Sequence, residues 1–106
     1  DERVAQSMQL KENRSICRQL AADLIRQIQD YQKNGFCVLG ILGMNGSPTC
    51  GVETRWGNLQ EEIGAGVFIQ SLRDQSESAQ ISLPMRGIKA QEPEAALKTL
   101  HYLLNL

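Results

Sequence analysis

Two adjacent stretches of the chain carry apolar residues in patterns typical of regular structure. Between residues 13 and 32 apolar side chains recur every three or four positions, which predicts one face of an amphipathic helix. The stripe consists of Ile16, Leu20, Leu24, Ile28 and Tyr31, widened by Cys17, Ala21 and Ile25. Residues 36–42, FCVLGIL, are then continuously apolar, as expected for a strand covered on both faces in a parallel sheet. Asn34 and Gly35 separate the two stretches and are typical of a helix end. The pattern predicts an αβ unit.

The second half of the chain predicts a further helix, strand and helix. Residues 66–73 suit a short helix, and the polar run 74–80 separates it from AQISLPM, residues 79–85, where Ile81 and Leu83 alternate as in a strand that Pro84 ends. Pro93 begins the last helix, whose stripe is Ala96, Leu97, Leu100, Leu103 and Leu104. Residues 56–66 are too rich in glycine to assign. This order predicts an α/β layer fold with a mostly parallel sheet.

Composition narrows the classes of partner. The 106 residues suit a single domain, 1–106, and a net charge of -1 provides no basic field for a nucleic acid duplex. No apolar stretch approaches the roughly 20 residues that span a bilayer, so we expect no membrane partner. Three cysteines at irregular spacing form no disulfide framework, which favours a reducing, cytoplasmic location. The chain starts at Asp1 rather than methionine, so we expect a preceding segment.

The candidate chemistry lies in residues 43–53, GMNGSPTCGVE, directly after the predicted strand. Ligands of α/β folds bind outside the carboxyl ends of strands, and glycines in such a turn let backbone amides form an anion-binding nest. Pro48 stiffens the turn and places Ser47 and Cys50 in one small arc. A thiol at which amide dipoles point is a competent nucleophile or metal ligand. The alternative is a tight αβ turn with a partly exposed cysteine.

Residues 38–53, VLGILGMNGSPTCGVE, resemble the signature strand and loop GxxGxxGSPSCGV of the thiouracil desulfurase-like family of bacterial proteins. The likeness extends to the helix before this SPTCG motif and to the strand and helix that close the chain. It covers nearly the whole chain, as the carboxyl-terminal half to two-thirds of a typical member. The resemblance implies a Rossmann-like three-layer sandwich, of which residues 1–106 are the carboxyl-terminal part.

In desulfurase members the resemblance further implies a [4Fe-4S] cluster held by three cysteines, whose open iron takes sulfur from a thiolated nucleobase. The motif cysteine matches Cys50, as cluster ligand and catalytic residue, and the motif serine of the substrate pocket matches Ser47. Asn45, Gly46 and Glu53 complete the candidate substrate-binding set. The family's other two ligand cysteines lie nearer the amino end and are not found in this sequence.

The two remaining cysteines are interpreted as structural. Cys17 shares the helix stripe, and buried cysteine behaves as a small apolar residue. Cys37 lies near the start of the predicted strand, roughly 17 Å from Leu42 at its other end. Arg86, after the second strand, is an anion contact at the Cys50 end of the sheet if both strands are parallel.

Three functions remain open. The first is a sulfur-handling desulfurase that cleaves a C–S bond of a small-molecule substrate, with Cys50 as ligand and Ser47 at the substrate. The second is a module of the same fold that lacks the cluster and binds a small anionic or planar ligand. The third is a structural or assembly domain that forms a homo-oligomer.

Overall fold

The computed structural model describes the backbone of residues 2–104 and the side chains of residues 11–104. The elements in chain order are α1 (Glu2–Lys33), β1 (Ile41–Met44), β2 (Thr54–Gly57), β3 (Gln60–Ile63), α2 (Val67–Ser78), β4 (Met85–Ile88) and α3 (Pro93–Leu104). Strands β1 and β4 form a parallel pair, and β2 and β3 form an antiparallel hairpin. The protein is therefore a mixed α/β fold, as the sequence predicts.

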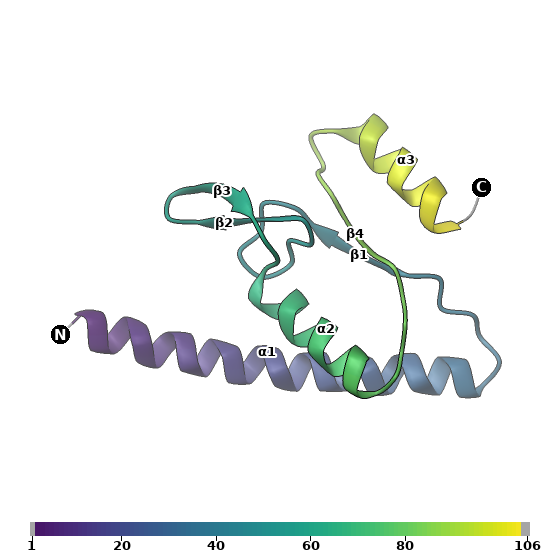
Figure 1. Cartoon of the computed structure of the whole chain (residues 1–106), viewed down its shortest axis with the longest axis horizontal. Helices are drawn as coiled ribbons and strands as arrows, with labels where there is room; N and C mark the ends of the chain where they lie inside the picture. The colour runs from purple at the N-terminus through teal and green to yellow at the C-terminus, as the bar shows by residue number, and fades with distance from the viewer. Residues whose placement is uncertain (1, 105–106) are drawn as a thin grey trace.

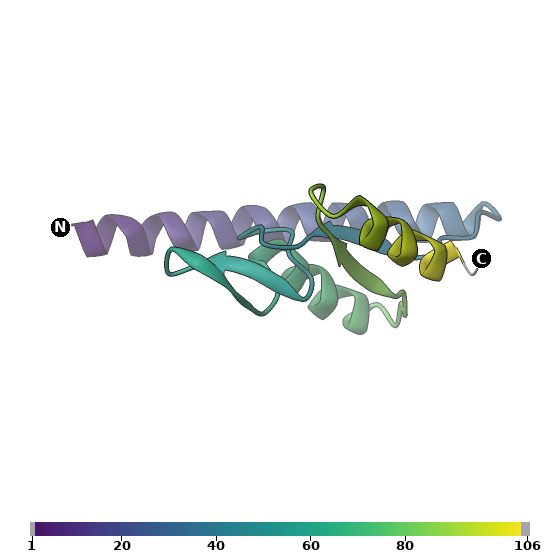
Figure 2. The same ribbon diagram turned by 90° about the horizontal axis from the view of Figure 1, so that it is seen from above.

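Helices lie on both sides of the parallel pair. Figures 1 and 2 show α1 and α2 on one side of β1 and β4, and α3 on the other. The molecule measures 51 × 33 × 17 Å. Neighbouring strands in a sheet lie about 4.8 Å apart, so few strands fit side by side along the shortest dimension. Within residues 2–104 the parallel sheet has two strands, so the mostly parallel sheet is confirmed only as this pair. Within the described part of the chain no helix is long and apolar enough to cross a membrane.

The core lies where α1 crosses α2 beneath the strand pair. Its buried members come from five parts of the chain and are Ala21, Ile25, Val52, Ala65, Ile69, Leu72 and Met85. Cys17 is also buried, which confirms its assignment to the packed stripe of α1. Gln75 in α2 donates its side-chain amide to the Arg18 carbonyl of α1 at 2.9 Å. This bond fixes which flank of α1 faces α2.

The end of α1 follows from two residues that the sequence singles out. The Gly35 N–H donates to the Gln32 carbonyl and the Phe36 N–H to the Tyr31 carbonyl, with Gly35 at φ 87°. This 6→1 and 5→2 pair is the Schellman motif, which needs a left-handed residue. The Tyr31 and Phe36 rings meet edge to face at 5.7 Å between centroids. The predicted helix over residues 13–32 is confirmed, and the observed helix starts earlier.

The strand predicted over residues 36–42 is shorter and later than expected. Only Ile41–Met44 pairs with a neighbour, and Cys37 is exposed rather than part of a buried strand. Leu39, Leu42 and Met44 are 48%, 42% and 44% exposed, so the strand is not covered on both faces. The physical reason is that α3 contacts β4 rather than covering β1, and that β1 has a partner strand on one edge only.

Two further predictions for the second half were wrong. The run 74–80, expected to be a polar separator, mostly continues α2, which ends at Ser78 with Gln80 at φ 58°. The second strand follows Pro84 instead of preceding it. Proline has no N–H for a ladder and suits the position just before pairing begins. Here the Pro84 carbonyl accepts the first bond, from the Ile41 N–H, at 2.9 Å.

The glycine-rich stretch 56–66 contains the hairpin that the sequence left unassigned. Asn58 and Leu59 form its two-residue turn, both with positive φ, at 50° and 64°. Such a turn matches the twist of paired strands, and asparagine followed by glycine is its usual signal. Leucine in place of that glycine conceals the hairpin in the sequence.

Truncating the core is expected to cost far more than truncating the hairpin turn. Leu72 of α2 is fully buried in the core, so Leu72→Ala should lower the free energy of unfolding by about 2–5 kcal/mol. Leu59 is 91% exposed, and Leu59→Ala should stay within about 0.5 kcal/mol of the wild type. Urea unfolding of both variants measures the difference, and equal losses would contradict this description of the core.

Candidate functional site

The loop between β1 and β2 is organised by one side chain, Asn45. Its Oδ1 atom accepts the backbone N–H groups of Val52 and Glu53, each at 3.1 Å, and of Thr54 at 3.5 Å. The Asn45 N–H donates to the Ile88 carbonyl of β4 at 2.9 Å. A single residue at the end of β1 therefore closes the loop on itself and joins it to the neighbouring strand.

Gly87 in β4 is the counterpart of Asn45. A Cβ at this position would overlap the Asn45 side-chain amide, so only glycine fits. The Gly87 N–H donates to the Glu53 Oε2 atom at 2.8 Å. Glu53, a predicted substrate-binding residue, thus has one carboxylate oxygen committed to the β4 backbone.

Ser47 fixes the next turn of the loop. Its Oγ atom accepts the N–H groups of Thr49 at 3.2 Å and Cys50 at 3.0 Å, and lies 3.2 Å from Thr49 Oγ1. A hydroxyl has two acceptor lone pairs and one proton. Thr49 Oγ1 gives its own proton to the Cys50 sulfur, so Ser47 is the donor in the contact between the two hydroxyls. The loop therefore uses both lone pairs and the proton of Ser47.

The amides of the loop do not form the anion-binding nest that the sequence suggests. Every N–H from Asn45 to Thr54 donates to an acceptor within the protein, Pro48 having none to donate. The first amides of α2 are committed too, because Val67 donates to the Pro48 carbonyl and Phe68 and Ile69 donate to the Thr49 carbonyl. The loop itself caps the start of this helix, and neither amide set is open to an anion.

Cys50 is half-buried in this turn. Its carbonyl accepts the Met44 N–H at 2.9 Å, and a Cβ on Gly43 would clash with that carbonyl. Thr49 Oγ1 donates to the Cys50 sulfur at 3.5 Å, the one hydrogen bond of the thiol within the described residues. The fold therefore depends on the backbone of Cys50 for hydrogen bonds and close packing, and depends little on its thiol.

The described thiols do not by themselves fit a cluster held by three cysteines. Cys17 is buried in the packed stripe of α1, Cys37 is exposed before β1, and Cys50 lies after β1. Among residues 11–104 no three His, Cys, Asp or Glu side chains gather as a metal site. The chain brings one thiol to the loop.

A crevice of about 250 Å³ lies outside the carboxyl ends of β1 and β4. This is the position at which open α/β sheets bind ligands. Its polar lining includes Asn45, Thr54, Glu61 and Lys89. Asn45 is thus the predicted site residue that reaches the crevice, whereas Ser47 and Cys50 belong to the adjoining turn.

An ion pair closes one wall of this crevice. Lys89 Nζ lies 2.6 Å from Glu61 Oε2, and Thr54 Oγ1 donates to Glu61 Oε1 at 2.7 Å. These bonds, Lys89 first, hold the pKa of Glu61 below its ordinary value, and Glu61 raises the pKa of Lys89. The sequence does not predict that Lys89 and Glu61 form a pair, because the strand β3 that carries Glu61 cannot be recognised in it.

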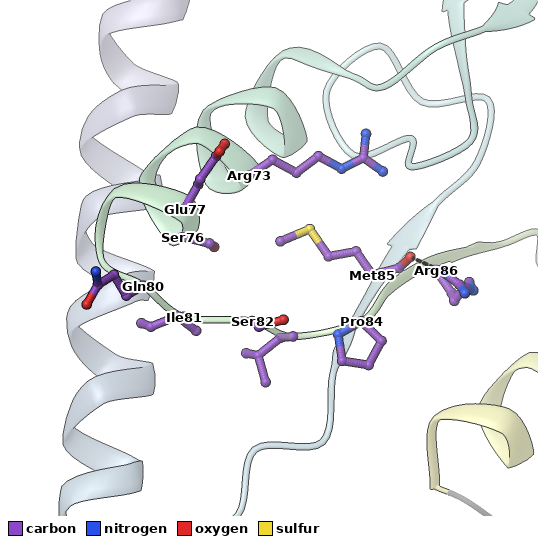
Figure 3. Close-up of a pocket in the computed structure, with 10 residues that line it drawn as sticks. Arg73, Ser76, Glu77, Gln80, Ile81, Ser82, Pro84, Met85 and Arg86 are labelled. Atoms are coloured by element: carbon purple, nitrogen blue, oxygen red, sulfur yellow. Dashed lines mark hydrogen bonds between the residues drawn. The ribbon is translucent and has the colours of Figure 1, made fainter.

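Arg86 is not at the Cys50 end as an anion contact. Strands β1 and β4 are parallel as assumed, but the Arg86 guanidinium lies 5.0 Å above the ring of Tyr102 in α3 and 3.4 Å from its hydroxyl. A larger groove borders the opposite, amino-terminal end of β4, along α2 and residues 80–84. Figure 3 shows Met85 pointing into it and Arg86 pointing away from α2. None of the residues that line the groove belongs to the loop of residues 45–53.

Removing the Asn45 amide is expected to open the loop selectively. In Asn45→Ala the N–H groups of Val52, Glu53 and Thr54 lose their acceptor, so their hydrogen exchange should accelerate at least tenfold, with a stability loss of about 1–3 kcal/mol. Gln91→Ala, in the exposed turn before α3, should change neither quantity. Unchanged exchange at the three amides would refute the role of Asn45.

The ion pair predicts a stability change in acid. Because the pKa of folded Glu61 lies below 4.5, the pair stabilises the fold fully above that pH and loses its effect as pH falls through the lowered pKa. The melting temperature of the wild type should exceed that of Glu61→Gln near neutrality, and the difference should shrink below pH 4.5. Glu12→Gln, in the exposed part of α1, is the control. A constant difference between pH 3 and 7 would contradict the pairing.

A comparison of the chain with protein-family models, with curated proteins and with solved structures finds no match.

Proposed function

We propose that this protein handles sulfur in the manner of the thiouracil desulfurase-like family, with Cys50 as its sulfur ligand. The observation that carries the proposal is that the fold does not need the Cys50 side chain. The Cys50 N–H bonds to Ser47 and its carbonyl to Met44, and both bonds would survive in alanine. A thiol held rigidly at the carboxyl end of a strand, with no structural task, is a candidate for chemistry.

The substrate would be a thiolated nucleobase or a related small molecule, from which a C–S bond is cleaved. The crevice beside the loop has suitable groups for a planar heterocycle, because an amide, a hydroxyl, a carboxylate and an ammonium group line it. Asn45 lines the crevice, and Gly46 connects it to Ser47 in the turn that carries the thiol. On the thiol side Ser47 would bind the substrate by turning its proton from Thr49 Oγ1 to the ligand, and Glu53 orients β4 through Gly87.

An iron-sulfur cluster enters this proposal with Cys50 as one thiolate ligand. A cluster held by three protein thiolates needs two that the described residues do not bring to the loop. When bound, such a cluster would supply an iron that takes up sulfur. The residues of this chain would hold the thiolate in place, exclude water from the turn and position the substrate. Free thiols suit a reducing compartment such as the cytoplasm.

A second candidate function is favoured by the completeness of the crevice. The Lys89 and Glu61 ion pair and Asn45 already fix the lining of the crevice. The Cys50 thiol, in contrast, has no second cysteine beside it. A module that binds a small planar or anionic ligand without a cluster would need nothing further. The two functions differ in their dependence on Cys50.

Iron uptake is expected to depend on Cys50. Anaerobic reconstitution with iron, sulfide and dithiothreitol, whose thiolates can complete the ligand set, should load the wild type and the control Cys37→Ala. Cys50→Ala should lose most of the bound iron and the visible absorbance while keeping its circular dichroism. Iron and sulfide counted per chain give the result.

Equal iron in the wild type and Cys50→Ala would refute Cys50 as ligand. No iron in any form would refute the sulfur-handling proposal and favour the binding module. Circular dichroism separates both outcomes from a failure to fold, because the bonds of the Cys50 backbone do not involve its sulfur.

A further inference from the structure

The hairpin of β2 and β3 turns one of its two faces to the crevice. Thr54 lies opposite Ile63 in the antiparallel register. Trp56 lies opposite Glu61, so these four side chains share one face. On that face Thr54 Oγ1 donates to Glu61 Oε1, and Glu61 Oε2 accepts a bond from Lys89. All three bonded residues line the crevice. We call this side of the hairpin the crevice face.

Trp56 continues the crevice face beyond the ion pair. It is the direct cross-strand neighbour of Glu61 and lies two residues after Thr54, toward the hairpin turn. The Cβ atoms of such a cross-strand pair are about 4.5–5.5 Å apart. Trp56 is also 51% exposed. A large aromatic ring thus lies uncovered next to the polar wall formed by Glu61 and Lys89.

The opposite face of the hairpin makes the contacts that hold it to the fold. Arg55 Nε lies 3.1 Å from Glu62 Oε1 of the neighbouring strand. The same guanidinium donates from Nη1 to the Ala65 carbonyl at 3.2 Å. Trp56 lies on the other face and takes no part in these bonds. Aromatic side chains usually contribute to stability by burying about 150–250 Å², so a tryptophan that is half exposed here has little structural role.

The polar groups of the crevice are suited to the carbonyl groups of a ligand. Asn45 uses its Oδ1 atom for three backbone amides, and its Nδ2 amide has no acceptor among residues 11–104. Lys89 Nζ carries three protons, of which one bonds to Glu61. Amide and ammonium protons of this kind bind carbonyl oxygens.

The charge and size of the crevice select an uncharged ring. Two carboxylates, Glu61 and Glu92, and one ammonium group, Lys89, are the charged groups of its lining. An excess of negative charge disfavours a phosphate or carboxylate ligand. The volume of about 250 Å³ is smaller than the roughly 300–1,000 Å³ of sites for drug-sized ligands. A molecule of one or two rings is therefore the occupant that fits.

We propose that Trp56 is a binding residue of this crevice and that its indole stacks on an uncharged, planar heterocycle. Asn45 and Lys89 donate to the carbonyl groups of that ring. The inference rests on the proposed function, because it takes the crevice as the ligand site, and it adds the requirement that the ligand be flat. Stacking of a base on an aromatic side chain changes affinity by about 5- to 150-fold.

The fluorescence of Trp56 tests the proposal directly, because it is the one tryptophan of the chain. The wild type, without iron, is titrated with uracil and with dihydrouracil. The two compounds carry the same carbonyl and N–H groups, but the dihydrouracil ring is saturated and puckered. Uracil should quench the fluorescence and bind at least fivefold more tightly than dihydrouracil. Equal affinities, or no binding of uracil, would overturn the proposal.

Calorimetric titration of variants provides a second readout. Trp56→Ala should bind uracil about 5- to 150-fold more weakly than the wild type. Trp56→Phe retains a smaller ring and should lose less affinity than Trp56→Ala. Leu59→Ala, in the hairpin turn and 91% exposed, is the control and should bind as the wild type does. Circular dichroism identifies variants that fail to fold. Unchanged affinity in Trp56→Ala, or an equal loss in Leu59→Ala, would contradict stacking.

Iron uptake separates this inference from the sulfur-handling proposal. Trp56→Ala should take up as much iron as the wild type, because an indole provides no ligand to a cluster. If uracil binding depends on Trp56 and no form takes up iron, the sulfur-handling proposal fails and stacking in the binding module stands. If iron uptake depends on Cys50 while Trp56→Ala binds uracil normally, the inference about Trp56 fails alone.

Discussion

Three backbone amides share one acceptor, the Asn45 side-chain oxygen, and the rest of the structure depends on this arrangement. It turns the chain back at the end of β1, so that the turn of residues 47–50 can cap the first amides of α2. It also places Glu53 where its carboxylate reaches Gly87 of β4. Without it, the hydrogen bonds that join the loop, the hairpin and the second strand would lose their common anchor.

The dense packing of this loop separates residues that the fold requires from one that it does not. Gly43, Gly66 and Gly87 are required because a Cβ would strike the Cys50 carbonyl, the Thr49 backbone and the Asn45 amide, respectively. Asn45 and Ser47 are required for their bonds to amides. Most positions of residues 43–53 are therefore explained by the geometry of the loop. The Cys50 sulfur accepts one bond, from Thr49 Oγ1 at 3.5 Å, and has no further structural role among the described residues.

Much of the fold was predictable from the sequence, because α1, α3 and the loop after β1 carry local signals. Pro93 begins a helix and Gly35 ends one whatever the tertiary context. The hairpin was not predictable, since Leu59 adopts a positive φ that leucine rarely has. The full length of α2 was missed because its last turn is polar and faces solvent in part. The placement of Ser47 and Cys50 in one turn around Pro48 was predictable, whereas the Lys89 and Glu61 pair depends on strand pairing that no local pattern encodes.

The apolar run of residues 36–42 is less buried in the structure than its sequence predicts. A continuous apolar run such as residues 36–42 is typical of a strand with neighbours on both edges and layers on both faces. In the single chain that run has a neighbour on one edge, and Leu39 and Leu42 remain exposed. On its outer edge β1 bonds to the loop rather than to a strand, because the Met44 N–H donates to the Cys50 carbonyl at 2.9 Å. The apolar run therefore ends in a short strand whose second neighbour is the chain's own turn.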